Sequence, residues 1–421
     1  MAGLYIHIPF CASRCIYCGF YSTTRLEQRQ RYVDAICKES STAPLSSPGG
    51  DTNVFGTAKP PLGEVLGGRL STIYLGGGTP SQLTPAQLEQ LFTYIYNRYK
   101  VSPDAEVTME CNPDDVTADY AAALSQLPVN RVSMGAQTFD DGRLHFLHRR
   151  HTSRQVAEAV AHLRHAGIRN ISIDLMYGFP HETLSDWERD IDAALALDVE
   201  HLSAYCLMYE EGTPLYEKMR KENLAIRNDA SDELERRMYE LLMDRLEAAG
   251  FEHYEISNWG RLTPLKGEGS PLLRGGAGAY RSRHNSNYWK DVPYVGLGAA
   301  AHSYLPVGKP LPSEGFEEGR RFWNVADLQE YMRRIEHGES PVEGSELIEG
   351  WTRYNDRVTV ALRTCEGLDL TTLPDEQRRY CTKTARRFLD DGLLRLQDQH
   401  LILTRRGLFV SDMVMSELMY V

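Results

Sequence analysis

The sequence predicts an α/β fold, in which a partial (β/α)6 barrel of the TIM type is followed by a mainly helical C-terminal domain. Six apolar, strand-like runs alternate with helical patterns up to about residue 215. Beyond that point the alternation stops, and from about residue 325 helical patterns dominate. Strands that alternate with helices are typical of parallel βα units, and six in succession predict an open form of the eight-fold barrel.

The expected elements follow in chain order. The strand-like runs are residues 4–10, 71–76, 106–111, 131–137, 170–177 and 201–208. The helical patterns are residues 25–38, 85–99, 118–127, 154–166, 184–197 and 232–249. Residues 43–70 are rich in Pro, Gly and Ser and predict a surface-loop insertion, and residues 267–278 predict a flexible glycine-rich stretch. We expect three domains: the barrel (1–215), a barrel extension (216–324) and a helical domain with a small winged hairpin at 392–404 (325–421).

Composition excludes several classes of protein. Hydrophobic residues make up 42% and charged residues 25% of the 421 positions, which is ordinary for a globular protein and excludes wholesale disorder. The formal net charge of -12 argues against nucleic acid as the main partner. No apolar run reaches the roughly 18 to 20 residues of a membrane-spanning helix, and the first residues do not resemble a signal peptide. We therefore expect a cytoplasmic protein.

Three of the eight cysteines are bunched directly after the first strand, namely Cys11, Cys15 and Cys18. Three thiolates on one tight loop suit an iron–sulfur cluster or another metal, and a [4Fe–4S] cluster with three cysteine ligands leaves one iron open. Zinc is the alternative, but a structural zinc site needs four ligands, and only His7 or Cys37 could supply the fourth. The spacing favours the cluster, while the other five cysteines are expected to be small buried hydrophobes.

Polar residues follow the later strands at their carboxyl ends, where barrel enzymes have their active sites. They are Gly77, Gly78 and Thr79 after the second strand, Glu110 at the third, Gln137 and then Arg149 after the fourth, and Asp174 on the fifth. Glycines let backbone approach a ligand closely, and their amides can bind a charged group. Each residue alone would be an ordinary turn, cap or surface residue. Together with the three cysteines they predict a functional site at the barrel mouth.

These motifs resemble the radical S-adenosylmethionine superfamily, in the branch that contains oxygen-independent coproporphyrinogen dehydrogenases (HemN) and HemW-type haem chaperones. The matching segments, besides the cysteine loop and the glycine turn at 76–80, are residues 4–10, 130–137, 174–180, 210–214, 254–258 and 296–303. The resemblance covers nearly the whole chain outside residues 44–68. It implies that the barrel is a radical S-adenosylmethionine barrel.

The resemblance also implies roles for individual residues. Cys11, Cys15 and Cys18 would hold a [4Fe–4S] cluster, and S-adenosylmethionine would chelate the fourth iron. The residues that match cofactor contacts are Tyr5, Tyr17, Gly77, Gly78, Thr79, Glu110, Gln137, Arg149 and Asp174. Carboxylates and amides suit ribose hydroxyls, and a guanidinium suits a carboxylate. In members that carry out radical chemistry, an electron from the cluster cleaves the sulfonium to give a 5′-deoxyadenosyl radical.

Two features resemble the HemW type rather than HemN. Phe20 stands where HemN has a further cysteine, two residues after Cys18. The segment 284–289 matches the His-Asn-x-x-Tyr-Trp motif of HemW-type haem chaperones, with His284 as the expected axial ligand and Tyr288 and Trp289 packing on the porphyrin. Taken without the family context, the same segment reads as a loop with two aromatic anchors. His302 is a second candidate ligand.

The function expected from the resemblance is that of a haem chaperone, which binds haem as cargo and hands it to recipient haemoproteins, some of them membrane-bound. Family members can dimerise, but no interface is visible in the sequence. The main alternative is the oxidative decarboxylation of coproporphyrinogen III by a radical enzyme. A zinc-stabilised nucleic-acid module on the winged tail is a third reading, which the balanced charge of that tail disfavours.

Overall fold

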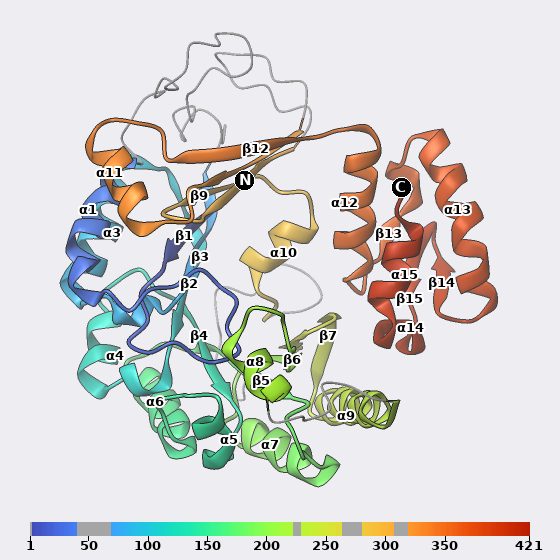
Figure 1. Cartoon of the computed structure of the whole chain (residues 1–421), viewed down its shortest axis with the longest axis horizontal. Coiled ribbons are helices and arrows are strands. Elements are labelled where there is room, and N and C mark those ends of the chain that lie inside the picture. The colour runs from blue at the N-terminus through green and yellow to red at the C-terminus, as the bar shows by residue number, and fades with distance from the viewer. Residues whose placement is uncertain (1, 40–68, 222–228, 263–279, 307–318) are drawn as a thin grey trace.

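The computed structural model describes residues 2–39, 69–221, 229–262, 280–306 and 319–421 (Figure 1). The expected loop insertion at 43–70, apart from its last two residues, and the glycine-rich stretch at 267–278 lie outside the described residues. No helix in the described part of the chain is long and apolar enough to cross a membrane.

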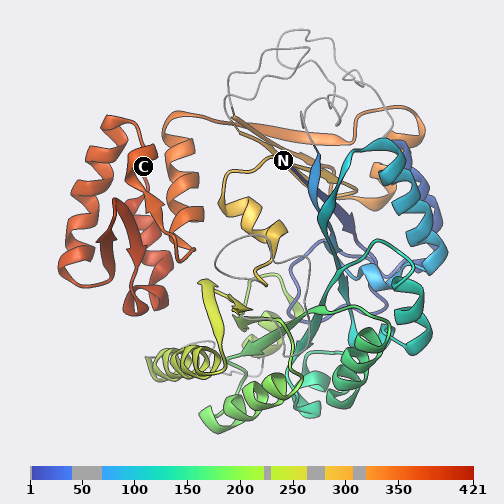
Figure 2. The same cartoon turned by 180° about the vertical axis from the view of Figure 1, so that it is seen from behind.

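All six predicted barrel strands are confirmed, and each pairs in parallel with the next. They are β1 (Ala2–Ile8), β2 (Leu70–Gly77), β3 (Val101–Cys111), β4 (Arg131–Gln137), β5 (Asn170–Tyr177) and β6 (His201–Cys206). The helices between them are α1 (Arg29–Glu39), α3 (Pro85–Arg98), α4 (Ala118–Leu124), α5 (Asp141–Phe146), α6 (Ser153–His165) and α7 (Leu184–Ala196). Figures 1 and 2 show these helices along the outer, convex side of the curved sheet.

The sheet extends beyond the six predicted strands at both edges and contains twelve strands among the described residues. Beside β1 lies β9 (Tyr294–Leu297), which is also parallel, and then the antiparallel strands β10 (His302–Leu305), β11 (Gly319–Asn324) and β12 (Val342–Ile348). Beside β6 lie β8 (Asn258–Arg261) and β7 (Phe251–Glu255), also antiparallel. These strands have only four to seven residues, too few for a periodic pattern to stand out in the sequence.

The two faces of the barrel strands differ in polarity. On β1, Leu4, Ile6 and Ile8 are buried in the main hydrophobic core under the helices. The intervening residues face the hollow of the sheet, where Tyr5 and His7 are hydrogen-bonded to each other. Other residues on this inner face are Thr72, Tyr74, Glu106, Glu110, Arg131, Ser133, Ser172, Asp174, His201 and Ser203. Parallel strands with two covered faces are usually apolar throughout, so this alternation marks the inner face as a site for polar chemistry.

The C-terminal unit has its own hydrophobic core. Its elements are α12 (Gly350–Leu362), β13 (Leu368–Asp369), α13 (Asp375–Asp390), β14 (Leu394–Gln397), β15 (His400–Leu403), α14 (Arg405–Phe409) and α15 (Ser411–Leu418). The expected hairpin is β14–β15, turned by Asp398 and Gln399 at φ values of 49° and 66°. This core starts at α12, later than the boundary expected at residue 325. The reason is that α11 (Leu328–Glu336) buries Tyr331 and Met332 in the main core, and β12 joins the large sheet.

Ion pairs fasten this unit to the barrel on both sides of α10 (Arg283–Trp289). Before α10, the Arg281 guanidinium donates to Glu252 on β7 at 2.6 Å and also contacts Glu366 of the C-terminal unit. After α10, Arg353 on α12 donates to the Asp291 carboxylate at 2.8 Å. The helix α10 is therefore held between the sheet and α12, as Figure 1 shows.

Candidate functional site

The cysteine loop follows β1 and packs against the ends of neighbouring strands. The Thr79 hydroxyl donates to Cys11 Sγ at 3.4 Å, and Arg149 Nη1 donates to Cys15 Sγ at 3.5 Å. Burial raises the pKa values of the Cys11 and Cys18 thiols, and the neighbouring Cys15 thiol raises both further. Cys15 thus interacts electrostatically with both other thiols, although among the described residues no three His, Cys, Asp or Glu side chains are placed so that they could hold a metal ion. Hydroxyl and guanidinium donors beside the sulfurs suit an anionic sulfur-ligated group.

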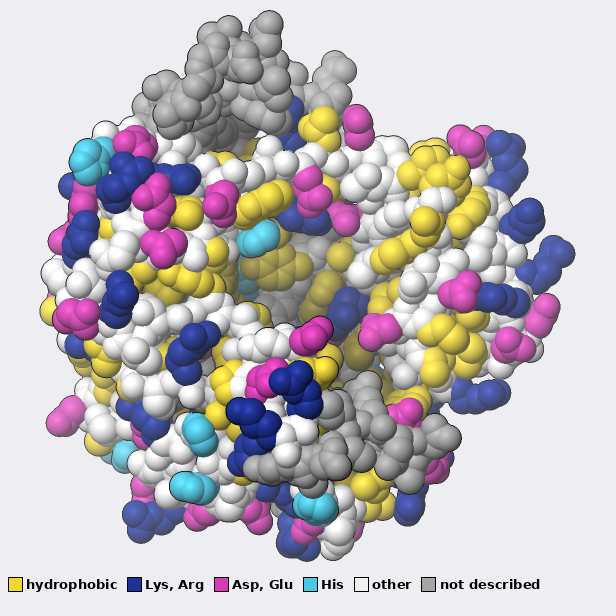
Figure 3. Space-filling model, viewed as in Figure 1, with side chains coloured by type: hydrophobic (Ala, Val, Ile, Leu, Met, Phe, Trp, Pro, Cys, Tyr) yellow, Lys and Arg dark blue, Asp and Glu magenta, His cyan; other side chains and the backbone are white. Residues whose placement is uncertain are grey.

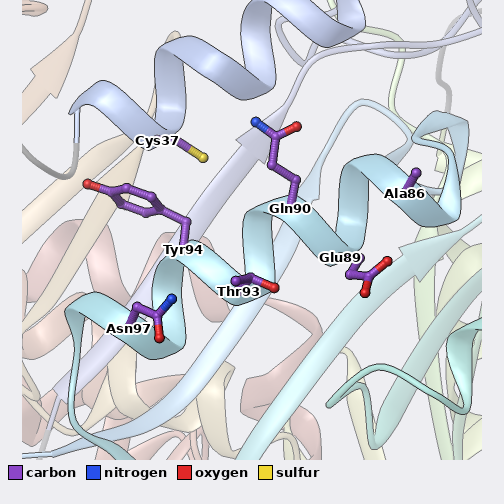
Figure 4. Close-up of a pocket in the computed structure, with 7 residues that line it drawn as sticks. All are labelled: Cys37, Ala86, Glu89, Gln90, Thr93, Tyr94 and Asn97. Carbon is purple, nitrogen blue, oxygen red and sulfur yellow. The ribbon is translucent and has the colours of Figure 1, made fainter.

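The two residues that could complete a zinc site do not lie at this loop. His7 Nδ1 is 3.0 Å from the Tyr5 hydroxyl, and its Nε2 is 3.1 Å from the Tyr21 carbonyl oxygen, so both ring nitrogens are bonded within the chain. Cys37 lies on α1, at a depression of about 480 Å³ between α1 and α3 on the outer side of the barrel (Figure 4). None of the predicted site residues lines this depression. The geometry therefore disfavours the zinc alternative.

Close packing within the chain requires glycine in the turn after β2, whether or not a ligand is bound. Gly77 has φ +108°, and a Cβ there would lie 2.4 Å from His7 Cε1. A Cβ on Gly78 would lie 2.6 Å from the Pro9 carbonyl carbon. The Gly77 amide donates to Glu110 at 3.1 Å. Glycine at these positions lets the end of β2 approach the start of the cysteine loop.

Two carboxylates stand on the inner face below the loop. Glu110 accepts from the Tyr74 hydroxyl at 2.7 Å, and burial raises its pKa to about 7. Both oxygens of Asp174 are 3.3 Å from the Ser133 hydroxyl, and burial raises its pKa to about 6. Each carboxylate keeps a partly exposed side toward the hollow of the sheet. Carboxylates in such a setting can accept hydrogen bonds from the hydroxyls of a bound nucleoside.

Arg149 occupies the centre of the mouth. Its Nη2 donates to the Asn112 side-chain oxygen at 2.8 Å and to the Gly135 carbonyl at 2.7 Å. Its Nε is buried and has no hydrogen-bond partner in the structure. Gln137, at φ +69°, lies over Gly135, where a Cβ would meet both the Gln137 amide and the Arg149 guanidinium. A buried guanidinium with an unfilled N–H has donor capacity left for an anionic ligand.

Tyr17 and Tyr5 lie on two sides of this mouth. Burial raises the pKa of the Tyr17 phenol, which also interacts with Arg149 and the Cys15 thiol. Tyr5 stacks on Tyr74 at 6.2 Å between ring centroids. The nine side chains and glycines expected to meet S-adenosylmethionine therefore come from β1, β2, β3, β4, β5 and the loops that follow them, and they face one hollow.

The predicted haem motif lies on α10, at the other end of the same hollow. Ser282 caps the helix, and the His284 amide donates to Glu106 at 3.0 Å. His284 is 1% exposed. Its Nδ1 lies 2.8 Å from the Thr72 hydroxyl and its Nε2 lies 2.9 Å from the Tyr288 hydroxyl. Burial lowers the pKa of this imidazole to about 3, so it is neutral, but both nitrogens are engaged.

The other two residues of the motif are also packed inside the fold. Tyr288 meets Tyr294 of β9 edge to face at 4.5 Å, and Trp289 lies 6.1 Å from Tyr254. His302, the second candidate, differs because it is exposed, on the first residue of β10. Its ring stacks on Trp323 of β11 at 5.9 Å.

Sequence reasoning missed several residues of the hollow, including Tyr74, Asn112, Arg131 and Ser133. One signal could have found most of them. In the predicted strands, polar residues recur at every second position, as in Thr72–Tyr74 and Arg131–Ser133, and a period of two assigns them to one face. Asn112 lies in a loop and carries no such signal.

Comparison with known proteins places the chain in a family. Residues 5–194 match the model of the radical SAM superfamily, and residues 348–410 match the HemN C-terminal domain. The chain is 32% identical to heme chaperone HemW of Mycobacterium tuberculosis over 99% of this chain and 94% of that protein. It is 31% identical to heme chaperone HemW of Bacillus subtilis over 98% of each chain.

A solved structure supports the fold. Coproporphyrinogen III oxidase (HemN) of Escherichia coli superposes with a TM-score of 0.73 over 99% of this chain and 89% of that chain, at 18% sequence identity. This likeness extends over the barrel and the C-terminal unit and confirms the predicted fold class. The full-length likeness to the two bacterial relatives shows that the chain belongs to the HemW family of the radical SAM superfamily.

Proposed function

We propose that this protein is a haem chaperone, which binds haem as cargo and transfers it to recipient haemoproteins while carrying a [4Fe–4S] cluster and S-adenosylmethionine. The observation that carries the proposal is the arrangement of one continuous inner face. The cysteine loop and Arg149 lie at one end of it, and the histidines and aromatic rings of α10, β9, β10 and β11 lie at the other. Membership of the HemW family supports it.

For the cluster, the proposed ligands are Cys11, Cys15 and Cys18. The donors from Thr79 and Arg149 at the first two sulfurs would stabilise the negative charge of thiolate and sulfide, as hydrogen bonds to cluster sulfurs do. Family membership implies this cluster and its cofactor. A cluster held by these cysteines would supply the chemistry of one-electron reduction of S-adenosylmethionine.

For S-adenosylmethionine, Arg149 is the proposed partner of the carboxylate, because its buried Nε has no other partner. Glu110 and Asp174 are the proposed partners of ribose hydroxyls, and Gln137 contributes an amide. Tyr5, Tyr17 and the backbone of Gly77, Gly78 and Thr79 would complete the walls. All of these groups face the hollow, and the inner carboxylates are shielded enough from water for burial to raise their pKa values.

For haem, α10 is proposed to form one wall of the cargo site through Tyr288 and Trp289. His284 could coordinate iron only after the Thr72 or the Tyr288 hydroxyl gave up its ring nitrogen, since these two hydroxyls occupy both nitrogens. The proposed partners are recipient haemoproteins, membrane-bound ones included. The eight cysteines, all in described parts of the chain, form no disulfide, which supports the proposal of a reducing, cytoplasmic compartment.

The alternative, oxidative decarboxylation of coproporphyrinogen III, has less support. Its relative HemN shares only 18% of residues with this chain, which shows the fold alone. HemN has a further cysteine two residues after the third cysteine of its loop. This chain has Phe20 at that position, and the Phe20 side chain is 70% exposed.

The test uses the full chain, reconstituted with iron and sulfide under anaerobic conditions and supplied with S-adenosylmethionine. We expect saturable binding of one haem per chain, measured by absorbance. A parallel assay with coproporphyrinogen III and a reductant should release no carbon dioxide. Conversion of coproporphyrinogen III without saturable haem binding would contradict the haem chaperone and support oxidative decarboxylation instead.

A further inference from the structure

We propose that haem binds on the inner face of β9, β10 and β11, with the imidazole of His302 as the axial ligand of the iron. This inference rests on the proposed function, because it takes haem as the cargo. It assigns the ligand to a residue outside the His-Asn-x-x-Tyr-Trp motif.

His302 is accessible in a way that His284 is not. It is exposed, and within the described chain no hydrogen bond engages its ring nitrogens, whereas both nitrogens of His284 are bonded inside the fold. Burial and the nearby Arg321 lower the pKa of His302, which favours the neutral form of the ring. A neutral imidazole with a free nitrogen is the state that binds haem iron.

The surroundings of His302 form an aromatic surface on one face of the sheet. The strand register pairs His302 with Trp323 and pairs Tyr304 with Tyr294, so all four rings project from the same side. The register also pairs Tyr304 with Arg321, so the Arg321 guanidinium, which is ion-paired with Glu346, lies on this side as well. The Tyr304 and Tyr294 rings are 6.2 Å apart. Trp323 lies flat across β12, where a Cβ on Gly344 would come within 2.5 Å of its ring. Flat aromatic surfaces of this kind suit a planar, largely apolar macrocycle.

This surface opens into a depression of the molecule. Figure 3 shows a hollow in the middle of this face, below β12, with hydrophobic side chains and a histidine at its rim. The register of β9 on β1, which pairs Gly3 with Tyr294, makes it continuous with the hollow that contains Tyr5 and the mouth of the barrel. A haem here would therefore lie on the same inner face as the proposed cluster.

Guanidinium groups stand at the edge of the aromatic surface. Arg353 Nη2 is paired with Asp291, which also accepts from the Tyr304 hydroxyl, but Arg353 Nη1 is buried without a partner. Burial and the charge of Arg353 lower the pKa of Arg357, whose Nη1 donates only to the Thr372 carbonyl. Two neighbouring guanidiniums, one of which has a buried N–H without a partner, suit the propionate carboxylates of haem.

The first test is haem titration of the anaerobically reconstituted chain and of three variants, followed by absorbance and electron paramagnetic resonance. His302→Ala should weaken haem binding by at least about tenfold and change the spin state of the ferric iron, and added imidazole should restore the original spectrum. His284→Ala should keep the iron spectrum of the natural chain. His337→Ala, at an exposed site after α11, is the matched control and should behave as the natural chain does.

The outcomes separate the inference from the function on which it rests. If the natural chain binds haem and His302→Ala binds it equally with the same spectrum, the ligand assignment is wrong while the haem chaperone stands. Loss of the iron signature in His284→Ala alone would move the ligand to α10. If the natural chain binds no haem, the proposed function fails, and the assignment fails with it.

A second variant tests the propionate contacts independently. Arg357→Gln should weaken the binding of haem several-fold but leave the binding of the haem dimethyl ester unchanged, because the ester lacks the carboxylates. Arg378→Gln, on the exposed side of α13, is the control. Equal weakening for haem and its ester, with unchanged circular dichroism, would contradict the role of Arg357.

Discussion

The Nδ1 atom of His284 lies 2.8 Å from the hydroxyl of Thr72, although 212 residues separate them in the chain. This contact places α10 inside the barrel, against the inner face of β2. Tyr74, two residues further along the same strand, stacks on the His284 ring at 5.0 Å and donates to Glu110. One strand therefore links the helix of the haem motif to a carboxylate of the proposed cofactor site.

Replacing His284 should cost stability. His284→Ala removes the partner of the Tyr288 hydroxyl and one of the two partners of the Thr72 hydroxyl, and it opens a cavity, so we expect a loss of about 2–4 kcal/mol in the free energy of unfolding. The measurement is urea denaturation of the chain without cluster. His337→Ala, whose ring lies at the surface, should change stability by less than about 0.5 kcal/mol. A His284 variant as stable as the natural chain would show that α10 does not pack as described.

The raised pKa of Asp174 predicts a pH dependence of stability. Burial raises this pKa from 3.8 to about 6 in the folded chain. The folded state thus holds the proton more tightly than the unfolded state, and the resulting stabilisation is present at low pH and is lost as the pH rises through about 6.

Asp174→Asn removes the loss of stability at higher pH, because the amide cannot ionise. The Ser133 hydroxyl can still form a hydrogen bond to the amide. The variant should gain on the order of 1–3 kcal/mol relative to the natural chain between pH 4 and pH 7.5. Paired denaturation curves at these two pH values measure the difference. A difference that does not change with pH would show that Asp174 ionises as it does in water.

Arg149 should determine the affinity for S-adenosylmethionine. Arg149→Lys keeps a positive charge but loses the planar set of donors that reaches Asn112, Gly135 and Cys15, so we expect affinity to fall about 10- to 100-fold. Calorimetric titration of the reconstituted protein measures it. Arg154→Lys, on the exposed side of α6, is the control. Unchanged affinity in the Arg149 variant would place the cofactor carboxylate elsewhere.

Iron content should depend on the cysteine loop alone. After reconstitution we expect about four irons per natural chain and none stably bound to Cys15→Ser. Cys365→Ser changes an exposed thiol of the C-terminal unit and should load iron normally. Full loading of the Cys15 variant, or one zinc in place of iron in the natural chain, would contradict the cluster.

Sequence patterns predicted the six parallel strands because each has an uninterrupted apolar outer face and a helix after it. They also predicted that Cys11, Thr79, Glu110 and Arg149 would meet, since the carboxyl ends of parallel strands share one edge. They did not predict that His284 is buried, because its partners Thr72 and Glu106 are distant in the chain and no local pattern connects them to it. Nor did they place β9 to β12, whose short pairings depend on register rather than on local periodicity.

The kinetics of transfer show whether the chain hands haem to other proteins. The haem-loaded chain is mixed with increasing concentrations of an apo-haemoprotein, and the absorbance of the recipient is followed. A transfer rate that rises with recipient concentration means that haem passes within a complex of the two proteins, as the account predicts. A rate that stays constant at the rate of spontaneous haem release would contradict it.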